Sequence, residues 1–159
     1  MAHGKKITGF VIFCLTIFMA ATAMAKMPGP DPKELWEHIT KTSPYTQWKF
    51  WDDHKGMLEG DEPHGSFHKV YVNDIAYGSS SVPLEYGAIE VKENYNKKEK
   101  LMAITVMYKV KGYNLEAGDW FWVRYSPKGK ANPYGKPKGC VNCHSGAADN
   151  DFVFVHEFK

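Results

Sequence analysis

The residues best suited to chemistry lie in one short stretch, GCVNCHSG, at residues 139–146. It contains two of the three cysteines of the chain, and His144 directly follows Cys143. On a helix, Cys140 and Cys143 would lie on one face, with His144 beside them. Two thiols at this spacing can take the two vinyl groups of a c-type haem while the imidazole binds the iron. The pattern predicts Cys140 and Cys143 as haem anchors and His144 as an axial iron ligand.

Zinc binding and a disulfide are two other uses of the same residues. A structural zinc site has four ligands and C-x-x-C-H supplies at most three, so His156 or another histidine would have to complete it. A disulfide framework usually has more cysteines at wider spacing. A thioredoxin-like redox pair needs a βαβ context, which the sequence does not predict. Haem attachment is the favoured interpretation, and zinc or a disulfide is the alternative.

Residues 1–25 have the features of a secretory signal peptide. Two lysines and an apolar run occupy residues 5–19, and Ala23-Met24-Ala25 matches a cleavage signal. The apolar run is short for a membrane span, and a retained membrane anchor is the alternative. Cleavage after Ala25 would remove Cys14 with the signal and leave residues 26–159 as a single periplasmic haem domain. Such export agrees with haem c attachment in an oxidising compartment.

The charge balance argues against nucleic acid as a partner. The chain has 20 lysines and arginines and 18 aspartates and glutamates. Lys5 and Lys6 belong to the signal peptide, so the exported part is balanced. Arg124 is the single arginine. Nucleic-acid-binding domains usually gather basic residues on one face, and this sequence has no such excess.

The elements that must position the haem motif are predicted from local patterns. Asp31 and Pro32 are typical of a helix start, and the helix should extend to Ile39. Short strands joined in sequence favour an antiparallel sheet of four to five strands with helices at the two ends, an α+β fold on which the haem packs. The expected strands are 67–72, 87–95, 101–110 and 119–125, and the expected loops are 53–65, 96–100 and 128–138.

Most of the exported chain resembles cytochrome P-460 and its relative cytochrome c′-beta. The resemblance implies one haem c on a sheet face, a proximal His144, and a five-coordinate iron whose distal position is open to small ligands. It also implies a soluble redox partner and a homodimer, for which an exposed aromatic strand such as DWFWVRY (119–125) would suit an interface. The similar segments are PHGSFHKVYVNDIAY (63–77), GAIEVKENY (87–95), ITVMYKVKGYNLEAGDWFWVRY (104–125) and the most specific one, GCVNCHSGAADNDFVFVHEF (139–158).

Lys92 separates the two branches of this family. In the P-460 branch a lysine in a similar strand is bonded to the porphyrin edge, and the enzyme oxidises hydroxylamine. The c′-beta branch lacks that lysine and binds nitric oxide. Strand alternation places Lys92 and Glu90 on one face, opposite Ile89 and Val91. The polar pair is typical of a solvated strand face, whereas the resemblance implies that Lys92 faces the haem.

In contrast to the lysine, another feature of the P-460 pattern is missing. The enzyme has a carboxylate over the iron, and an ungapped match back from Trp120 places Ile104 at that position. Hydroxylamine oxidation needs a base near the iron. Ile104 therefore favours a protein without this activity, which would bind nitric oxide or transfer electrons. Glu90 and Asp119 are the candidate replacements for the base.

Two methionines and two histidines are further candidate iron ligands. Met102 and Met107 lie five apart on one strand and so face opposite sides, and both are expected in the core. His64 lies in a Pro-His-Gly turn, where a distal ligand role is the less favoured use. His68 lies near the start of the following strand.

Arg124 is a candidate for cofactor binding. It alternates with Trp120 and Trp122 on one strand. The tryptophans are expected to pack against the core and the haem. Arg124 would then either bind a haem propionate or lie on the surface.

Overall fold

The computed structural model describes Met1 and residues 26–158. The rest of the predicted signal peptide, with Cys14 and the cleavage site after Ala25, lies outside the described residues. None of the described helices is long and apolar enough to cross a membrane.

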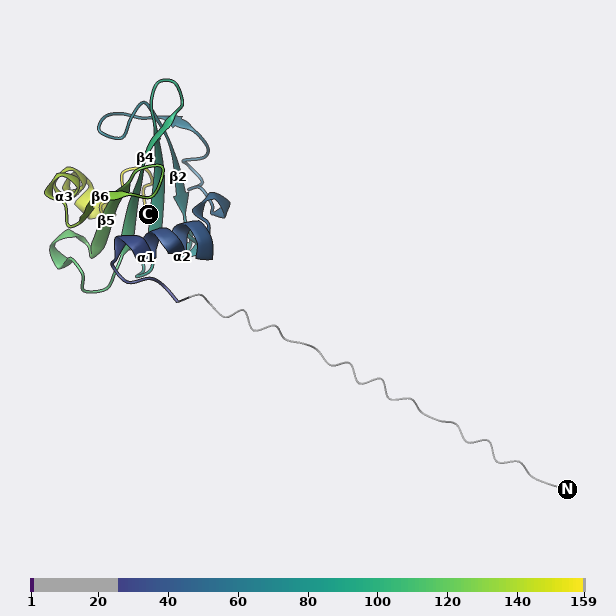
Figure 1. Cartoon of the computed structure of the whole chain (residues 1–159). Helices are drawn as coiled ribbons and strands as arrows, with labels where there is room; N and C mark the ends of the chain where they lie inside the picture. The colour runs from purple at the N-terminus through teal and green to yellow at the C-terminus, as the bar shows by residue number, and fades with distance from the viewer. Residues whose placement is uncertain (2–25, 159) are drawn as a thin grey trace.

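A six-stranded antiparallel sheet forms the centre of the fold, and each strand pairs with its neighbour in sequence (Figure 1). The predicted α+β class is confirmed, with more strands than expected. Two strands lie in segments predicted to be loops. The strands are β1 (Leu58–Glu59), β2 (Phe67–Val72), β3 (Ile89–Tyr95), β4 (Leu101–Lys109), β5 (Trp120–Tyr125) and β6 (Ala131–Gly135).

The last of these strands, β6, contains Pro133. A proline is tolerated there because β6 is an edge strand, with one side that needs no backbone donor. Its pairing with β5 is irregular between Val123 and Tyr125.

Helices flank the sheet at both ends of the described chain, as predicted. Asp31 caps the first one, because its Oδ1 accepts hydrogen bonds from the backbone N–H groups of Lys33 and Glu34, both at 2.9 Å. The α-helices are α1 (Pro32–Glu37), α2 (Asp74–Gly78) and α3 (Lys138–His144). The shorter helical turns are η1 (His38–Thr42), η2 (Tyr45–Gln47), η3 (Leu115–Ala117) and η4 (Ser145–Asn150).

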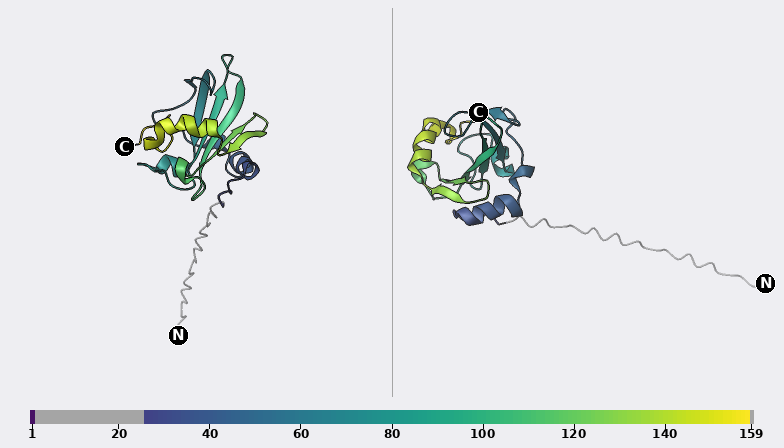
Figure 2. Two further views of the ribbon diagram at one scale, coloured as in Figure 1. Left: turned by 90° about the vertical axis from the view of Figure 1, so that its left-hand side faces the viewer. Right: turned by 45° about the horizontal axis from the view of Figure 1, so that its top comes forward.

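The sheet separates two apolar cores. On one side, which we call the α1 face, Leu35 and Ile39 pack with Val91 and Val106. On the other side, the α3 face, Cys140 and Val141 pack against a second core cluster. The left view of Figure 2 shows α1 and α3 on opposite sides of the strands. The pairing registers place on the α3 face His68, Val70 and Val72 of β2; Glu90, Lys92 and Asn94 of β3; Ala103, Thr105 and Met107 of β4; and Trp120, Trp122 and Arg124 of β5.

Candidate haem site

Helix α3 carries the whole C-x-x-C-H motif. Cys140, Cys143 and His144 lie within its seven residues, in the helical arrangement that the spacing predicts. Both thiols are free; Cys140 is half-buried against the α3-face core, whereas Cys143 is exposed. The absence of a bond between these two thiols gives the disulfide interpretation no support.

His144 has its ring orientation fixed by the backbone. Its Nδ1 lies 2.8 Å from the carbonyl oxygen of Phe152. Because a carbonyl can only accept, Nδ1 must donate, and in the neutral ring the lone pair is then on Nε2. Burial lowers the pKa of His144, which favours this neutral form. Metal-binding histidines typically have this arrangement, with the second ring nitrogen held by a backbone or carboxylate oxygen.

Three aromatic rings surround His144. The ring centres of Trp122 and Phe154 lie 4.7 Å and 5.2 Å from that of His144. The ring of His64 lies 6.2 Å away, with its plane at 89° to that of His144. A loop between β1 and β2 therefore contributes a second imidazole to the neighbourhood of the predicted iron ligand.

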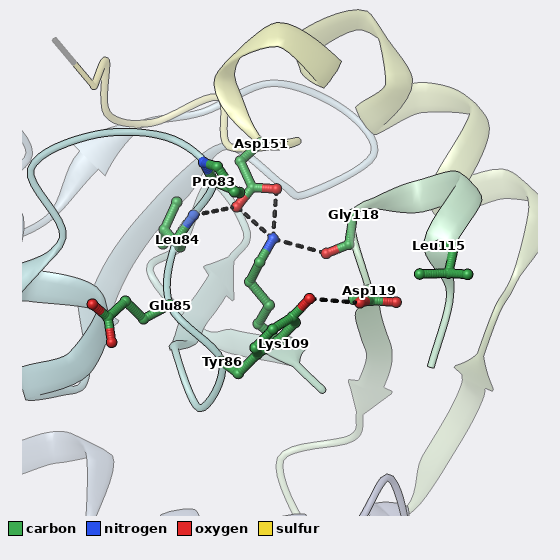
Figure 3. A pocket seen from close by; sticks show the side chains of 9 residues that line it. All are labelled: Pro83, Leu84, Glu85, Tyr86, Lys109, Leu115, Gly118, Asp119 and Asp151. Atoms are coloured by element: carbon green, nitrogen blue, oxygen red, sulfur yellow. Dashed lines mark hydrogen bonds and ion pairs between the residues drawn. The ribbon is translucent and has the colours of Figure 1, made fainter. Parts of the chain in front are cut away.

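A buried ion pair anchors the turn that holds the Phe152 carbonyl. Lys109 Nζ lies 2.6 Å from both carboxylate oxygens of Asp151 and donates to the carbonyl of Gly118 at 2.8 Å (Figure 3). The same carboxylate accepts the backbone N–H of Leu84 at 2.7 Å. Asp151 and Phe152 have φ angles of 53° and 67°. These contacts hold an uncommon backbone conformation that turns the Phe152 carbonyl towards His144.

Lys92 and Glu90 also lie on the α3 face, and the interpretation of this face as solvated is wrong. Glu90 is only 7% exposed, and Lys92 is half-buried. Trp51, which is far away in sequence, covers Glu90 and donates from its Nε1 to Glu90 Oε2 at 3.3 Å. Burial raises the pKa of Glu90 and lowers the pKa of Lys92. Both side chains are thus shifted towards their neutral forms.

Lys92 lies in the same site as His144. The pKa values of His54, His64 and His68 are all lowered, and those of His64 and His68 fall to about 4. Burial is the largest cause in each case, and the positive charge of Lys92 is the second. The charge of Lys92 also contributes to the lowered pKa of His144. Four histidines therefore gather around Lys92. Sequence reasoning considered His64 and His68 singly and missed the cluster, although three of its members lie within residues 54–68.

The structure corrects the position assigned to Ile104. Ile104 pairs with Glu93 and Tyr125 and is buried in the core of the α1 face. The β4 residue beside Lys92 on the α3 face is Thr105. Ile104 therefore cannot occupy a pocket shared with Lys92, and the argument from its apolar side chain no longer applies.

Asp119 is the weaker of the two candidate bases. Its carboxylate accepts the backbone N–H groups of Gly112 and Asn114, at 3.0 Å and 2.9 Å, and the hydroxyl of Tyr86 at 3.2 Å. These bonds fix the connection between β4 and β5. Glu90 is the only carboxylate on the α3 face of β2 to β5.

Strand alternation also predicts the positions of two methionines and of Arg124. Met107 is buried on the α3 face, as expected, whereas Met102 is exposed, so its prediction as a core residue is wrong. Arg124 is exposed on the α3 face, with Trp120 and Trp122 buried along the same strand. The view of residues 119–125 as an exposed aromatic strand is wrong, because β5 is an inner strand and its aromatic side chains are buried.

Unpaired polar atoms on the α3 face fit a cofactor that makes hydrogen bonds. In the described part of the chain, three buried side-chain atoms have no hydrogen-bond partner: His68 Nδ1, Asn94 Oδ1 and Trp122 Nε1. All three belong to α3-face residues, and buried polar groups are rarely left unpaired. A haem propionate could accept from Trp122 Nε1. Within residues 26–158, no three His, Cys, Asp or Glu side chains are grouped to hold a metal ion by themselves.

A C-x-x-C-H helix packed on the face of an antiparallel sheet, with an oriented histidine beside it, defines a haem cytochrome with a β-sheet fold. The family model for Cytochrome P460 matches residues 42–155. The chain belongs to the cytochrome P460 family and is a haem-binding cytochrome. No curated protein matches the chain.

Proposed function

We propose that the chain is a periplasmic mono-haem c cytochrome that binds and oxidises small nitrogen oxides such as hydroxylamine. Cys140 and Cys143 would hold the haem through thioether bonds, and His144 would bind its iron. The observation that carries the proposal is the convergence of His144 and Lys92 on one sheet face. His144 is oriented through Nδ1, which leaves Nε2 available.

A haem held by these residues would supply a redox-active iron for the nitrogen atom of the substrate, and a soluble redox partner would take up the electrons. The chain contributes the remaining groups. Glu90 is buried, and burial raises its pKa, which makes its carboxylate a stronger base than that of an exposed glutamate and suits it to take a proton from hydroxylamine. Arg124, exposed on the same face, is placed to bind a propionate.

Lys92 is the residue proposed to join the porphyrin edge. Burial lowers its pKa and so favours the neutral amine, which is the nucleophilic form. The new bond would replace an N–H bond of Lys92 and a C–H bond of the porphyrin. An oxidant of the peroxide class would take up the two hydrogen atoms and be reduced to water.

A non-enzymatic haem protein is the second candidate. It would bind nitric oxide or transfer electrons without turnover of hydroxylamine. The proximity of His64 to His144, with ring centres 6.2 Å apart, favours it, because a second imidazole near the iron would suit electron transfer.

The assembly is proposed to be a homodimer, as the family resemblance implies. Because the aromatic residues of β5 are buried, the interface must use another surface. Light scattering of the purified protein gives its mass and tests this directly.

The first experiment is an intact mass and a tryptic map of the mature protein, made in a host that attaches haem c. The proposal expects haem on the Cys140–Cys143 peptide and the Lys92 peptide joined to the same haem. In the Lys92→Arg variant the haem should stay on the cysteine peptide alone, and hydroxylamine oxidation should fall. A wild-type map without the Lys92 junction would exclude the cross-link. A protein without haem would contradict the proposal as a whole.

A further inference from the structure

The indole of Trp51 covers the buried carboxylate of Glu90. Trp51 is only 2% exposed and belongs to the apolar core of the α3 face. Its Nε1 donates to Glu90 Oε2 at 3.3 Å, and within residues 26–158 Glu90 Oε1 accepts no hydrogen bond. One carboxylate oxygen is therefore held by the indole, while the other is left to accept a proton.

The C-terminal segment packs on the same indole. The ring of His156 lies on Trp51, with ring centres 4.3 Å apart and planes 7° apart. Phe158 meets both rings edge-on, with its ring centre 5.4 Å from that of Trp51 and 4.7 Å from that of His156. His156 is itself fixed, because its Nδ1 lies 2.8 Å and 2.9 Å from the two carboxylate oxygens of Asp53. Trp51 thus contacts Glu90 through its N–H and the C-terminal segment through its ring face.

Asn150 joins this segment to the helix that carries the C-x-x-C-H motif. It lies in η4, which directly follows α3. Its Nδ2 donates to the carbonyls of Val153 and His156, at 2.7 Å and 2.6 Å, and its Oδ1 accepts the N–H of Phe158 at 3.1 Å. The chain that leaves the candidate haem helix therefore ends against the indole that covers the candidate base.

We propose that Trp51 positions Glu90 for hydroxylamine oxidation and that His156 holds Trp51 in that position. The inference rests on the proposed function, because Glu90 is the base proposed there. Trp51 and His156 are positioning residues: neither takes up a proton from the substrate, and both act through Glu90.

The charged groups around Glu90 show what Trp51 contributes. Burial is the largest influence on the pKa of Glu90 and raises it. The hydrogen bond from Trp51 lowers this pKa, as do the charges of Lys92 and of a protonated His156. Asp53 is the remaining charged group of this contact and is paired with His156. Trp51 therefore has two opposite effects, because it keeps water from the carboxylate and also stabilises its charged form.

Trp51→Phe separates these two effects, because it removes the hydrogen bond and keeps most of the cover. The pKa of Glu90 should rise further by about one unit, since a hydrogen bond to the charged form is lost. Glu90 works deprotonated, so the pH below which kcat/KM falls should rise by the same amount. Trp48→Phe is the matched control: it removes an indole that donates to Ser43 Oγ at 2.9 Å and packs against the α1-face core, and it should cause no shift.

His156→Ala should shift the pKa of Glu90 in the other direction. Without the stacked ring Trp51 loosens and water reaches Glu90, so the pKa falls towards the ordinary value of a glutamate. His156→Phe keeps a ring on the indole and should keep the pKa near that of the wild type. Loss of the His156 charge alone would raise the pKa equally in both variants, so the two variants separate stacking from charge.

The measurements use haem-loaded protein, with haem content confirmed by mass. The pH dependence of kcat/KM for hydroxylamine is one readout. The second is the infrared C=O band of the protonated Glu90 carboxyl, followed in a pH titration and identified by its absence in Glu90→Gln, which does not depend on turnover. If His156→Ala does not fold, Asp53→Ala, which removes the partner of the His156 ring, should shift the band in the same direction.

An unshifted pH profile and infrared band in Trp51→Phe would overturn the inference, as would equal shifts in His156→Ala and His156→Phe. A Trp48→Phe variant that shifts as far as Trp51→Phe would overturn it as well. A wild type that does not oxidise hydroxylamine would contradict the proposed function instead, and the infrared titration would still decide whether Trp51 and His156 control Glu90.

Discussion

Two glutamates on β3 show how neighbouring residues of one type acquire different roles. Glu93 faces the α1 side, where Tyr45, Tyr71 and Tyr95 donate to it at 2.8, 3.5 and 2.6 Å. Glu90 faces the α3 side, where Trp51 is its one side-chain donor. The carboxylate of Glu93 is thus used to hold the core together, while that of Glu90 can accept a proton.

Glu90→Gln should lower hydroxylamine oxidation by about 10²- to 10⁴-fold while haem attachment persists, because the base is lost. A base works deprotonated, so wild-type activity should fall as the pH drops through the pKa of Glu90. Burial raises that pKa, which places the acid limb above the ordinary range of a glutamate. The limb should be absent in Glu90→Gln. The measurement is the pH dependence of kcat/KM.

Glu93→Gln is the matched control at the residue scale. It should retain the rate and lose about 1–3 kcal/mol of unfolding free energy, because two buried tyrosines and a partly buried one lose their shared acceptor charge. Denaturant unfolding gives this value. Equal rates for wild type and Glu90→Gln would remove Glu90 from the mechanism.

At the scale of elements, the sequence predicts those helices and strands that a local residue pattern determines. Strands β2 to β5 have long β-prone runs, and the C-x-x-C-H spacing needs only a helix. Strand β1 has two residues and β6 contains Pro133, so neither has a local signal. The face of Lys92 could not be judged locally, because Trp51 and the C-terminal segment that cover it are distant in sequence. Ile104 was misplaced because an ungapped match does not establish strand register.

The Lys109–Asp151 pair links β4 to the turn that orients His144. Asp151→Asn leaves Lys109 buried without its counter-charge and should cost about 3–5 kcal/mol of stability. The double variant with Lys109→Met should lose less than the sum of the two single variants, because no unpaired charge remains. Thermal and denaturant unfolding measure both effects.

The exposed pair of Lys55 and Asp52, 2.8 Å apart, is the comparison for this prediction. Lys55→Met should leave stability unchanged, because solvent screens a surface pair. A similar loss in Lys55→Met and Asp151→Asn would contradict the special role of the buried pair.

For the whole molecule, the two faces of the sheet differ in whether their buried polar atoms have hydrogen-bond partners. The α1 face has an apolar core covered by α1, and the carboxylate of Glu93 there accepts hydrogen bonds from Tyr45 and Tyr95. The α3 face contains the three buried polar atoms that lack partners. A group bound on the α3 face could therefore supply hydrogen-bond partners that the described residues do not provide.

The Cys140→Ser/Cys143→Ser variant, purified without haem, should unfold at a lower temperature than the haem-loaded wild type. A group that binds only the folded state stabilises it, and here it also supplies partners to buried polar atoms. Calorimetry measures the difference. Adding haem to the variant should recover part of the loss, and equal unfolding temperatures would show that the α3 face is complete without haem.

The order of the strands has a consequence for how the protein is made. Each strand pairs with its predecessor in the chain, so pairing can proceed one hairpin at a time from the N-terminal end. Helix α3 and the turn at Asp151 follow the last strand. If the chain is exported as proposed, the sheet can therefore form before the haem-binding segment crosses the membrane. In that case the α3 face would stay uncovered until the end of translocation, and haem would be attached to an accessible C-terminal segment beside a sheet that has already formed.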